Sequence, residues 1–225
     1  MRMRSLSYRA ARWIYLRAQT RVRPRILSDT FVLEGRTYPL FLHETGMTWR
    51  SERIVEVPIG LEALQAAPDQ TRVLEVGNVL RQYRPDSRHT VVDKYERAPG
   101  VINQDAETFT GGPYDAIISL STIEHIGWDE TSRDPAKIPR VIERLRSLLA
   151  PGGRLTVTVP HRWNRDLDEL LAADALPFDT VSYLQRLDFS NRHWRQVQRA
   201  DIERIWYGHP YVGANAVAIA RLTAR

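Results

Sequence analysis

The chain contains no cysteine. Disulfides, cysteine-ligated zinc, iron–sulfur clusters and thiol nucleophiles are therefore excluded. Long apolar runs are also missing, since none approaches the roughly 18 residues that a membrane-spanning helix needs. The basic N-terminus lacks the continuous apolar segment and small-residue cleavage site of a signal peptide, so we expect a cytoplasmic protein.

Lysine is scarce too, because Lys94 and Lys137 are the only two in the chain. The positive charge is carried by arginine, and eight arginines with no acidic residue fall within positions 1–25. The rest of the chain is slightly acidic. We therefore expect a basic arm over residues 1–28, suited to an anionic membrane surface, a nucleic acid or a protein partner. The simpler alternative is a solvated or docked extension.

The remaining length, 29–225, suits one domain with its own core. A β-hairpin is expected over 30–41, with Glu34-Gly35 as its turn, as part of an N-terminal cap over 29–56. A helix is expected within 54–67, beginning after Pro58.

From Arg72 onward, short apolar segments alternate with helical stretches. A helix is expected over 138–149, with Pro139 in its first turn and a turn at 151–153 ending it. The alternation indicates an α/β fold with a mostly parallel sheet and helices on both faces. Strands are expected at 72–77, 90–93, 101–102, 114–120, 155–159 and 216–220.

Ligands of such sheets bind outside the carboxyl ends of the strands, where the strand order reverses. Gly77 follows the first expected strand and permits a tight turn, and Asn78 is placed to cap the next helix. Asp93 follows the second strand, 18 residues after Glu75, where a carboxylate can bind a ribose diol. Taken alone, Asp93 is as well explained as a turn or cap residue.

Several segments together resemble the successive motifs of class I S-adenosylmethionine-dependent methyltransferases, over roughly residues 72–160. A narrower resemblance, in 48–53 and 121–130, is to uncharacterised bacterial methyltransferase-like proteins. The resemblance implies a Rossmann-like fold and S-adenosylmethionine as cofactor. The segments that carry it are 73–77, 91–93, 104–106, 114–119, Glu124-His125 and 149–155.

The resemblance also implies roles for individual residues in binding S-adenosylmethionine. Glu75 and Gly77 would line its methionine moiety, and Ser121 would lie below its sulfonium. Asp93 would bind the ribose hydroxyls and Lys94 would lie against the adenosine. Adenine would be held by the Asp105 carboxylate and the Ala106 backbone N–H.

One departure from the family pattern lies in the first loop, which has the single glycine Gly77 followed by Asn78 and Val79. Either the loop takes a wider path around the cofactor, or cofactor binding is weakened or lost. The second outcome would make the protein a non-catalytic Rossmann-like protein.

His125 is the expected catalytic base beside Glu124, because an imidazole can accept a proton near neutral pH. The alternative is that Glu124 and His125 only cap or orient the following loop. Acids at 129, 130 and 134 allow a metal site, but surface acids are usually just solvated, so we expect none. The residues expected to contact the acceptor are Trp49, Arg53, Trp128, His161 and Asn164, with Trp163 as a further aromatic candidate.

The expected activity is methyl transfer to a small-molecule, glycan or lipid-linked acceptor. A nucleic-acid methyltransferase using the basic arm is the alternative, but we expect no nucleic acid, because the body is acidic and no Asn-Pro-Pro-Tyr motif occurs. A serine hydrolase is excluded by the lack of a Gly-x-Ser-x-Gly elbow. Contact with an anionic membrane surface would make the protein membrane-peripheral.

Overall fold

The computed structural model describes residues 29–43 and 48–225. The basic arm over 1–28, with the membrane contact expected of it, lies outside the described residues. Eight strands form one sheet in the order β5-β4-β3-β6-β7-β10-β8-β9. Their bounds are β3 Val73–Val76, β4 Thr90–Val92, β5 Val101–Ile102, β6 Tyr114–Leu120, β7 Leu149–Pro160, β8 Thr180–Arg186, β9 Trp194–Val197 and β10 Ala216–Thr223.

The first five strands of this sheet are parallel, and β10 is inserted antiparallel between β7 and β8. Numbered along the chain, these five strands have the spatial order 3-2-1-4-5, which is the Rossmann order. The order reverses between β3 and β6, and Val76 lies opposite both Val92 and Ser119 at that edge. The expected fold class, a mostly parallel α/β sheet, is confirmed.

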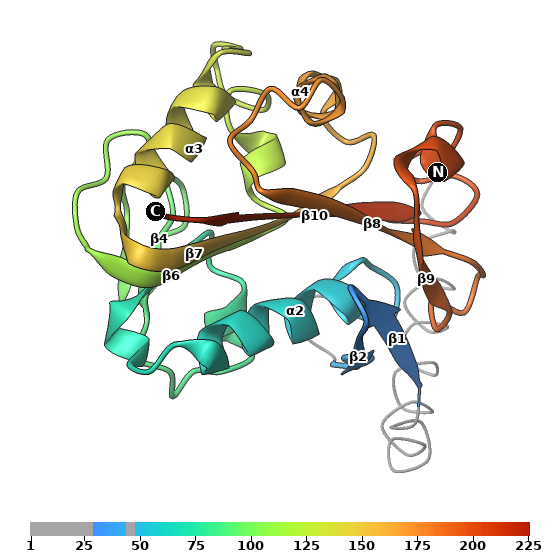
Figure 1. The fold of residues 1–225 in the computed structure, drawn as a ribbon, viewed down its shortest axis with the longest axis horizontal. Coiled ribbons are helices and arrows are strands. Elements are labelled where there is room, and N and C mark those ends of the chain that lie inside the picture. Colours follow the sequence, from blue (N-terminus) through green and yellow to red (C-terminus); the bar gives the residue numbers. More distant parts are fainter. Residues whose placement is uncertain (1–28, 44–47) are drawn as a thin grey trace, which may run out of the picture.

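Helices cover both faces of the sheet (Figure 1). Helix α2 (Arg53–Ala66) lies on one face, and α3 (Lys137–Ser147) and α4 (Arg165–Ala172) lie on the other. The described residues also form the short 3₁₀ turns η2 (Gln70–Arg72), η3 (Leu80–Gln82), η4 (Ile123–His125) and η5 (Arg199–Ile202). None of the described helices is both long and apolar enough to cross a bilayer.

The start predicted for the α2 helix was wrong, because the helix begins at Arg53 and carries Pro58 in its interior. A proline has no N–H, so the carbonyl of Ile54, four residues earlier, loses its helical partner. The backbone N–H of Phe41 donates to that carbonyl at 2.9 Å. A loop from outside the helix thus satisfies the group that Pro58 leaves open.

The end predicted for the α3 helix was also wrong. The helix stops at Ser147 and β7 begins at Leu149, so the 151–153 glycine turn lies inside the irregular start of that strand. The pairing of β6 with β7 shifts register there, between Tyr114 and Ala116. Pro139 lies in the first turn of α3, as expected.

The expected hairpin is confirmed as β1 (Thr30–Leu33) and β2 (Arg36–Pro39). Its turn residues Glu34 and Gly35 have φ angles of 53° and 76°, the left-handed conformation that a two-residue hairpin turn requires. Apolar side chains of the hairpin share a core with α2, β8 and β10, so the hairpin packs on the same face of the sheet as α2. That core contains Phe31, Leu33, Tyr38, Ile54, Leu184, Val217 and Ile219.

Candidate functional site

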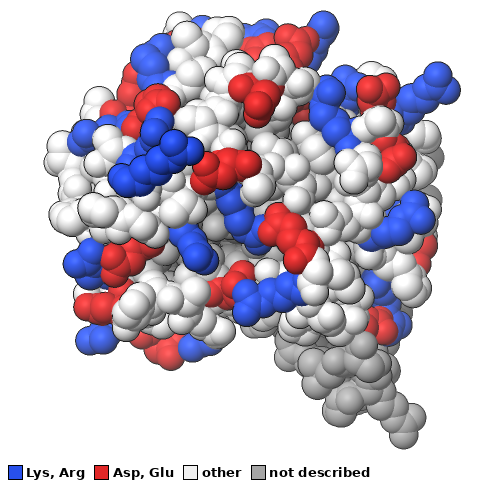
Figure 2. Space-filling model, viewed as in Figure 1, with Lys and Arg blue, Asp and Glu red and all other residues white. Residues whose placement is uncertain are grey.

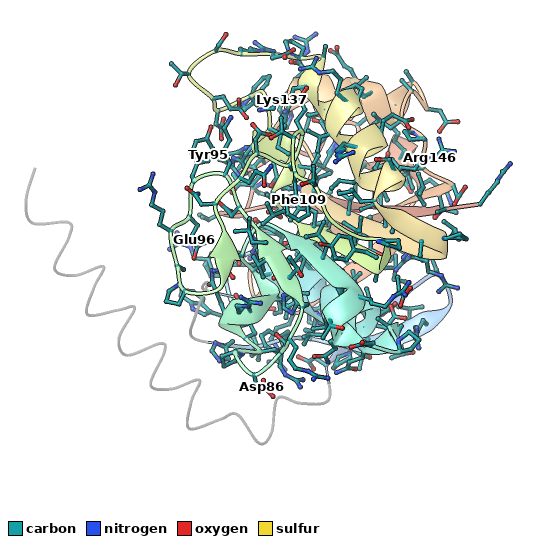
Figure 3. The ribbon with its side chains drawn as sticks, turned by 90° about the vertical axis from the view of Figure 1, so that its left-hand side faces the viewer. Asp86, Tyr95, Glu96, Phe109, Lys137 and Arg146 are labelled. Carbon is teal, nitrogen blue, oxygen red and sulfur yellow. The ribbon has the colours of Figure 1, made fainter. Side chains whose placement is uncertain are left out.

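A cavity of about 530 Å³ lies at the carboxyl ends of β3, β4 and β6, where the strand order reverses. Its size is within the ordinary range for small-molecule sites. In Figure 3, Tyr95 and Glu96 of the loop after β4 lie on the same side of the molecule as Lys137 at the start of α3. Among its lining residues are several that the sequence singled out: Arg53, Gly77, Asn78, Asp93, Lys94, Asp105, Ala106, Ser121 and His125.

Gly77 is the turn after β3, with φ +87° and its N–H donating to the Val92 carbonyl at 2.9 Å. A Cβ added to it would lie 2.1 Å from Thr122 Oγ1. Thr122, which follows β6, therefore occupies the space beside this glycine. Glycine is required here for backbone conformation and for the close approach of Thr122.

Glu75 does not line this cavity, which corrects the expectation that it contacts the methionine moiety. Its Oε1 accepts hydrogen bonds from the backbone N–H groups of Val79 (2.9 Å) and Leu80 (2.5 Å). Its Oε2 lies 2.8 Å from His89 Nε2, and both side chains are fully buried. The carboxylate is used to hold the loop after β3 in place.

Asn78 does not cap a helix, which corrects a second expectation. The segment after it is the 3₁₀ turn η3, whose amides are taken by Glu75, and no α-helix lies between β3 and β4. The Asn78 side chain instead donates to Glu96 Oε1 at 2.6 Å. It lines the cavity and ties the loop after β3 to the loop after β4.

Asp93 lies at the ribose end predicted for the cavity. Its Oδ1 accepts hydrogen bonds from the backbone N–H groups of Tyr95 (2.8 Å) and Glu96 (2.7 Å). Within the described part of the chain, Oδ2 makes no hydrogen bond. One oxygen thus fixes the loop while the other is available to a ligand.

Two lysines and two acids form a closed network at the adenine end. Lys137 Nζ lies 2.6 Å from Asp105 Oδ2 and 2.8 Å from Glu130 Oε1. Lys94 Nζ lies 2.9 Å from both acids. Burial acts to raise the pKa of Asp105, but hydrogen bonds from Lys137, the Glu107 backbone and Lys94 outweigh it and bring the pKa to about 2. An adenine amino group would have to compete with the lysines for Oδ2.

Ser121, expected below the sulfonium, binds a buried carboxylate that the sequence analysis missed. Its Oγ donates to Glu56 Oε1 at 2.6 Å, and Thr158 Oγ1 donates to the same atom at 2.8 Å. Arg53 donates to Glu56 Oε2 at 3.1 Å and to the Leu120 carbonyl at 2.8 Å. Burial raises the pKa of Glu56, although Arg53 opposes the shift. In the sequence, only the three-residue spacing from Arg53 could have suggested this pair.

His125 lies at the cavity, with its side chain 44% exposed. Its Nδ1 hydrogen-bonds Asp129 Oδ2 at 2.5 Å, and its Nε2 lies 3.8 Å from Glu124 Oε1. Glu124 is buried, and its Oε2 has no hydrogen-bond partner among the described residues. Burial raises the pKa of Glu124 well above its ordinary value, against a hydrogen bond from its own backbone N–H.

Trp163 and Tyr207 form an aromatic wall that adjoins His125 through Trp163, and neither ring is among the residues that line the cavity. The Trp163 ring lies 5.4 Å from the His125 ring and 4.7 Å from the Tyr207 ring, both in edge-to-face geometry. Burial, and then Glu52 and the other nearby acids, raise the pKa of Tyr207 to about 12. Tyr207 carries no motif in the sequence, and only the fold brings it to this place.

Asn164 and His161 were expected to contact the acceptor, but neither lines this cavity. Asn164 caps α4 through Oδ1, and its Nδ2 donates to the Glu124 carbonyl at 2.7 Å. His161 is held by Asp168 at 3.0 Å and by the Ile202 carbonyl at 3.2 Å, beside a separate hollow. Both are supporting residues in this structure.

The two tryptophans expected as substrate contacts also lie elsewhere. The Arg133 guanidinium lies over the Trp128 ring, with its Cζ 4.2 Å from the ring centroid. Trp49 lies half-buried in the turn before α2 and does not line the cavity. Trp163, the third aromatic candidate, does not line the cavity either, but its ring packs against His125.

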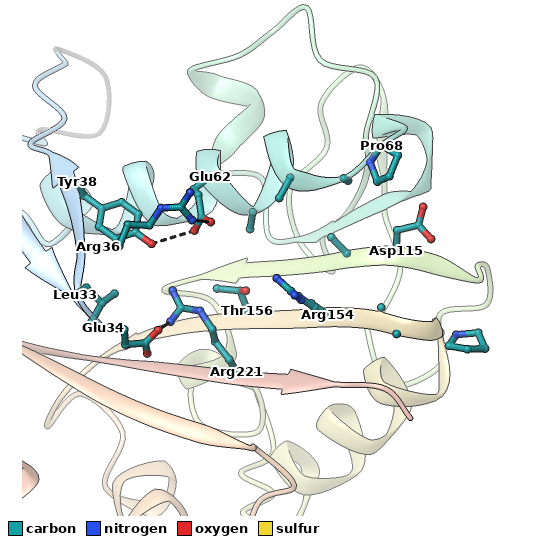
Figure 4. Close-up of a pocket in the computed structure, with 17 residues that line it drawn as sticks. Leu33, Glu34, Arg36, Tyr38, Glu62, Pro68, Asp115, Arg154, Thr156 and Arg221 are labelled. Carbon is teal, nitrogen blue, oxygen red and sulfur yellow. Dashed lines mark hydrogen bonds and ion pairs between the residues drawn. The ribbon is translucent and has the colours of Figure 1, made fainter.

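A larger cavity, of about 620 Å³, lies between α2 and the amino-terminal parts of β6 and β7 (Figure 4). Its carboxylates are paired within the protein, Glu62 with Arg36 and Glu34 with Arg221. On the outer surface seen in Figure 2, acidic and basic side chains are likewise interspersed. The strand ends that bind ligands in Rossmann-like sheets lie at the other end of the sheet, so the 530 Å³ cavity is the candidate site.

No protein-family profile matches the chain, and no curated protein matches it. Among solved structures, the N-methyltransferase NodS from Bradyrhizobium japonicum with S-adenosyl-L-homocysteine is 17% identical (TM-score 0.41, covering 68% of this chain and 76% of that one). A possible histamine N-methyltransferase from Thermotoga maritima is 16% identical (TM-score 0.45, covering 74% and 88%). A TehB-like methyltransferase from Corynebacterium glutamicum is 12% identical (TM-score 0.43, covering 73% and 86%). By its own strand order and the cavity at the reversal point, this chain has a Rossmann-like fold.

Proposed function

We propose that the protein transfers a methyl group from S-adenosylmethionine to an acceptor bound beside His125. The observation that carries this proposal is the single cavity that gathers Gly77, Asp93, Ser121 and His125 at the edge where the strand order reverses. A Rossmann-like sheet binds its nucleotide at that edge. The available Oδ2 of Asp93 gives the cavity an acceptor for a ribose hydroxyl.

The cavity residues divide between cofactor and acceptor. Asp93 would hold the ribose hydroxyls, and the Ala106 backbone N–H would hold the adenine ring. When bound, S-adenosylmethionine supplies an electrophilic methyl group on a sulfonium. His125 would take the proton that the acceptor loses, since Asp129 holds a proton on its other ring nitrogen.

The acceptor is proposed to be a small molecule, or a glycan or lipid-linked molecule that presents a small group at His125. The solved structures with a similar fold include a 16S rRNA methyltransferase. The expectation against a nucleic-acid acceptor therefore has no support from the comparisons.

Calorimetric titration of the full chain with S-adenosylhomocysteine tests the proposal. We expect micromolar binding and a rise in the unfolding temperature with ligand concentration, because a ligand that binds only the folded state stabilises it. Failure to bind at millimolar ligand would favour the non-catalytic alternative. Two features would then explain it, the η3 turn in place of a helix after β3 and the lysines on Asp105.

A further inference from the structure

A gap separates His125 Nε2 from the neighbouring Glu124 Oε1. The 3.8 Å between Nε2 and Oε1 is too long for a direct hydrogen bond. Two atoms at that separation can each lie at ordinary hydrogen-bond distance, about 2.8–2.9 Å, from the same third atom. His125 lines the cavity and the buried Glu124 does not, so a ligand atom in this position approaches from the His125 side.

The hydrogen-bond roles around this gap define the ligand atom. The Asp129 carboxylate can only accept, so His125 Nδ1 is the donor of this hydrogen bond, and in the neutral imidazole Nε2 is then an acceptor. An ionised Glu124 carboxylate is also only an acceptor. A group that bridges them must donate two hydrogen bonds. An amine or ammonium nitrogen does so, a hydroxyl has one hydrogen to give, and a carboxylate or phosphate dianion has none.

The surrounding charges favour a cation at the same place. Three glutamates, Glu52, Glu56 and Glu124, are buried near one another. The guanidinium of Arg53 lies among them. The contacts of Arg53 go to Glu56 and to a backbone carbonyl, and Glu124 Oε2 stays without a partner among the described residues. A buried, unpaired carboxyl with a raised pKa regains its charge when a cation binds beside it.

The aromatic wall suits the same ligand. The Trp163 ring packs against the His125 ring and the Tyr207 ring packs against Trp163, and aromatic faces attract ammonium groups. An arylalkylamine offers both the cation and an apolar body for this wall.

We infer that the acceptor is a primary amine, whose nitrogen is held between His125 Nε2 and the Glu124 carboxylate. The inference rests on the proposed function. The bound ammonium gives one proton to His125 Nε2, which frees the nitrogen lone pair. When bound, S-adenosylmethionine supplies the methyl group, and its carbon–sulfur bond breaks with the electron pair left on sulfur as the nitrogen–carbon bond forms. The methylated ammonium then keeps its ion pair with Glu124.

The test is a calorimetric titration of the full chain with three matched probes, benzylamine, benzyl alcohol and benzoate. It is run both with and without saturating S-adenosylhomocysteine. We expect benzylamine to bind at least about tenfold more tightly than benzyl alcohol, and benzoate to bind more weakly still. In Glu124→Gln the affinity for benzylamine falls about tenfold, while the affinity for S-adenosylhomocysteine is unchanged.

Glu143→Gln makes the same chemical change on the exposed side of α3 and should alter neither affinity. Trp163→Phe provides a second variant if Glu124→Gln fails to fold, and it should weaken benzylamine binding by removing the larger ring. The inference is overturned if benzoate or benzyl alcohol binds as tightly as benzylamine, if benzylamine does not bind at tens of millimolar, or if the folded Glu124 or Trp163 variant binds benzylamine normally. Benzylamine binding without any S-adenosylhomocysteine binding would instead contradict the proposed function alone.

Discussion

Glu75 Oε2 lies 2.8 Å from His89 Nε2, and neither side chain is exposed to solvent. The other oxygen of the same carboxylate receives two backbone N–H groups of the loop after β3. One buried side chain therefore anchors the loop that begins with Gly77. Glu75 was expected to bind the cofactor directly, but in the structure it holds the loop that lines the cavity.

Replacing Glu75 by alanine should lower the free energy of unfolding by about 3 kcal/mol, because a buried imidazole and two buried amides lose their hydrogen-bond partner. Urea unfolding followed by circular dichroism measures this. Glu143→Ala, at an exposed position on α3, should change the free energy by less than about 0.5 kcal/mol. A loss below about 1 kcal/mol in Glu75→Ala would show that water replaces the carboxylate without penalty.

Gly77→Ala should cost more stability than Gly152→Ala, although both glycines have positive φ angles, +87° and +75°. A Cβ at Gly152 meets nothing within 4 Å, so that variant measures the backbone penalty alone, about 1 kcal/mol. A Cβ at Gly77 would collide with Thr122 Oγ1 at 2.1 Å. Adding Thr122→Ala to Gly77→Ala should recover part of the difference in thermal stability. Equal costs at the two glycines would mean that Thr122 simply moves away.

Asp93→Ala should weaken binding of S-adenosylhomocysteine by at least about tenfold, or 1.4 kcal/mol, since charge-assisted hydrogen bonds to the ribose are lost. Asp93→Asn retains an oxygen for the Tyr95 and Glu96 amides, so it separates loss of charge from loosening of the loop. Asp86→Ala, on the exposed loop before β4, should bind normally. The ribose role is refuted if calorimetry gives wild-type affinity for Asp93→Ala.

Glu124→Gln should become more stable relative to the wild type as the pH rises above 4.5, the ordinary pKa of a glutamic acid. Folding raises the pKa of Glu124, so between the unfolded and folded pKa values the folded state binds more protons than the unfolded state. Wild-type stability therefore falls with pH across that window and levels off above the folded pKa. Glutamine does not titrate, so its variant lacks this contribution. The free energy of unfolding, measured with urea from pH 4 upward, checks this for both proteins. Curves that run parallel with pH would contradict the prediction.

The sequence on its own determined six strands of the sheet and the hairpin. Runs such as 114–120 and 216–220 are short and largely apolar, a pattern that favours buried strands, and both are strands buried in the sheet. The Glu34-Gly35 turn depends on local backbone preferences alone. The sequence also placed Gly77, Asp93, Ser121 and His125 in one cavity, because the carboxyl ends of parallel strands share an edge.

The sequence did not predict β8, β9 or the start of α2. Strands β8 and β9 mix polar with apolar residues near the edge of the sheet, where little burial is needed to hold them. Pro58 marked a helix start by local rules. Only the contact between Phe41 and the Ile54 carbonyl allowed the helix to continue through it.

The chemistry of the site was decided by tertiary structure. Glu75 and Glu124 are both carboxylates next to a strand end, yet one is satisfied by two amides and His89 while the other keeps an oxygen without a partner among the described residues. Trp163 meets His125, and Tyr207 meets Trp163, across long stretches of chain. Strand periodicity and turn type follow from neighbouring residues, whereas burial and the hydrogen-bond partners of a side chain depend on which distant segments pack against it. The sequence therefore determined where a ligand can bind, and the packing of distant segments decided which groups face it.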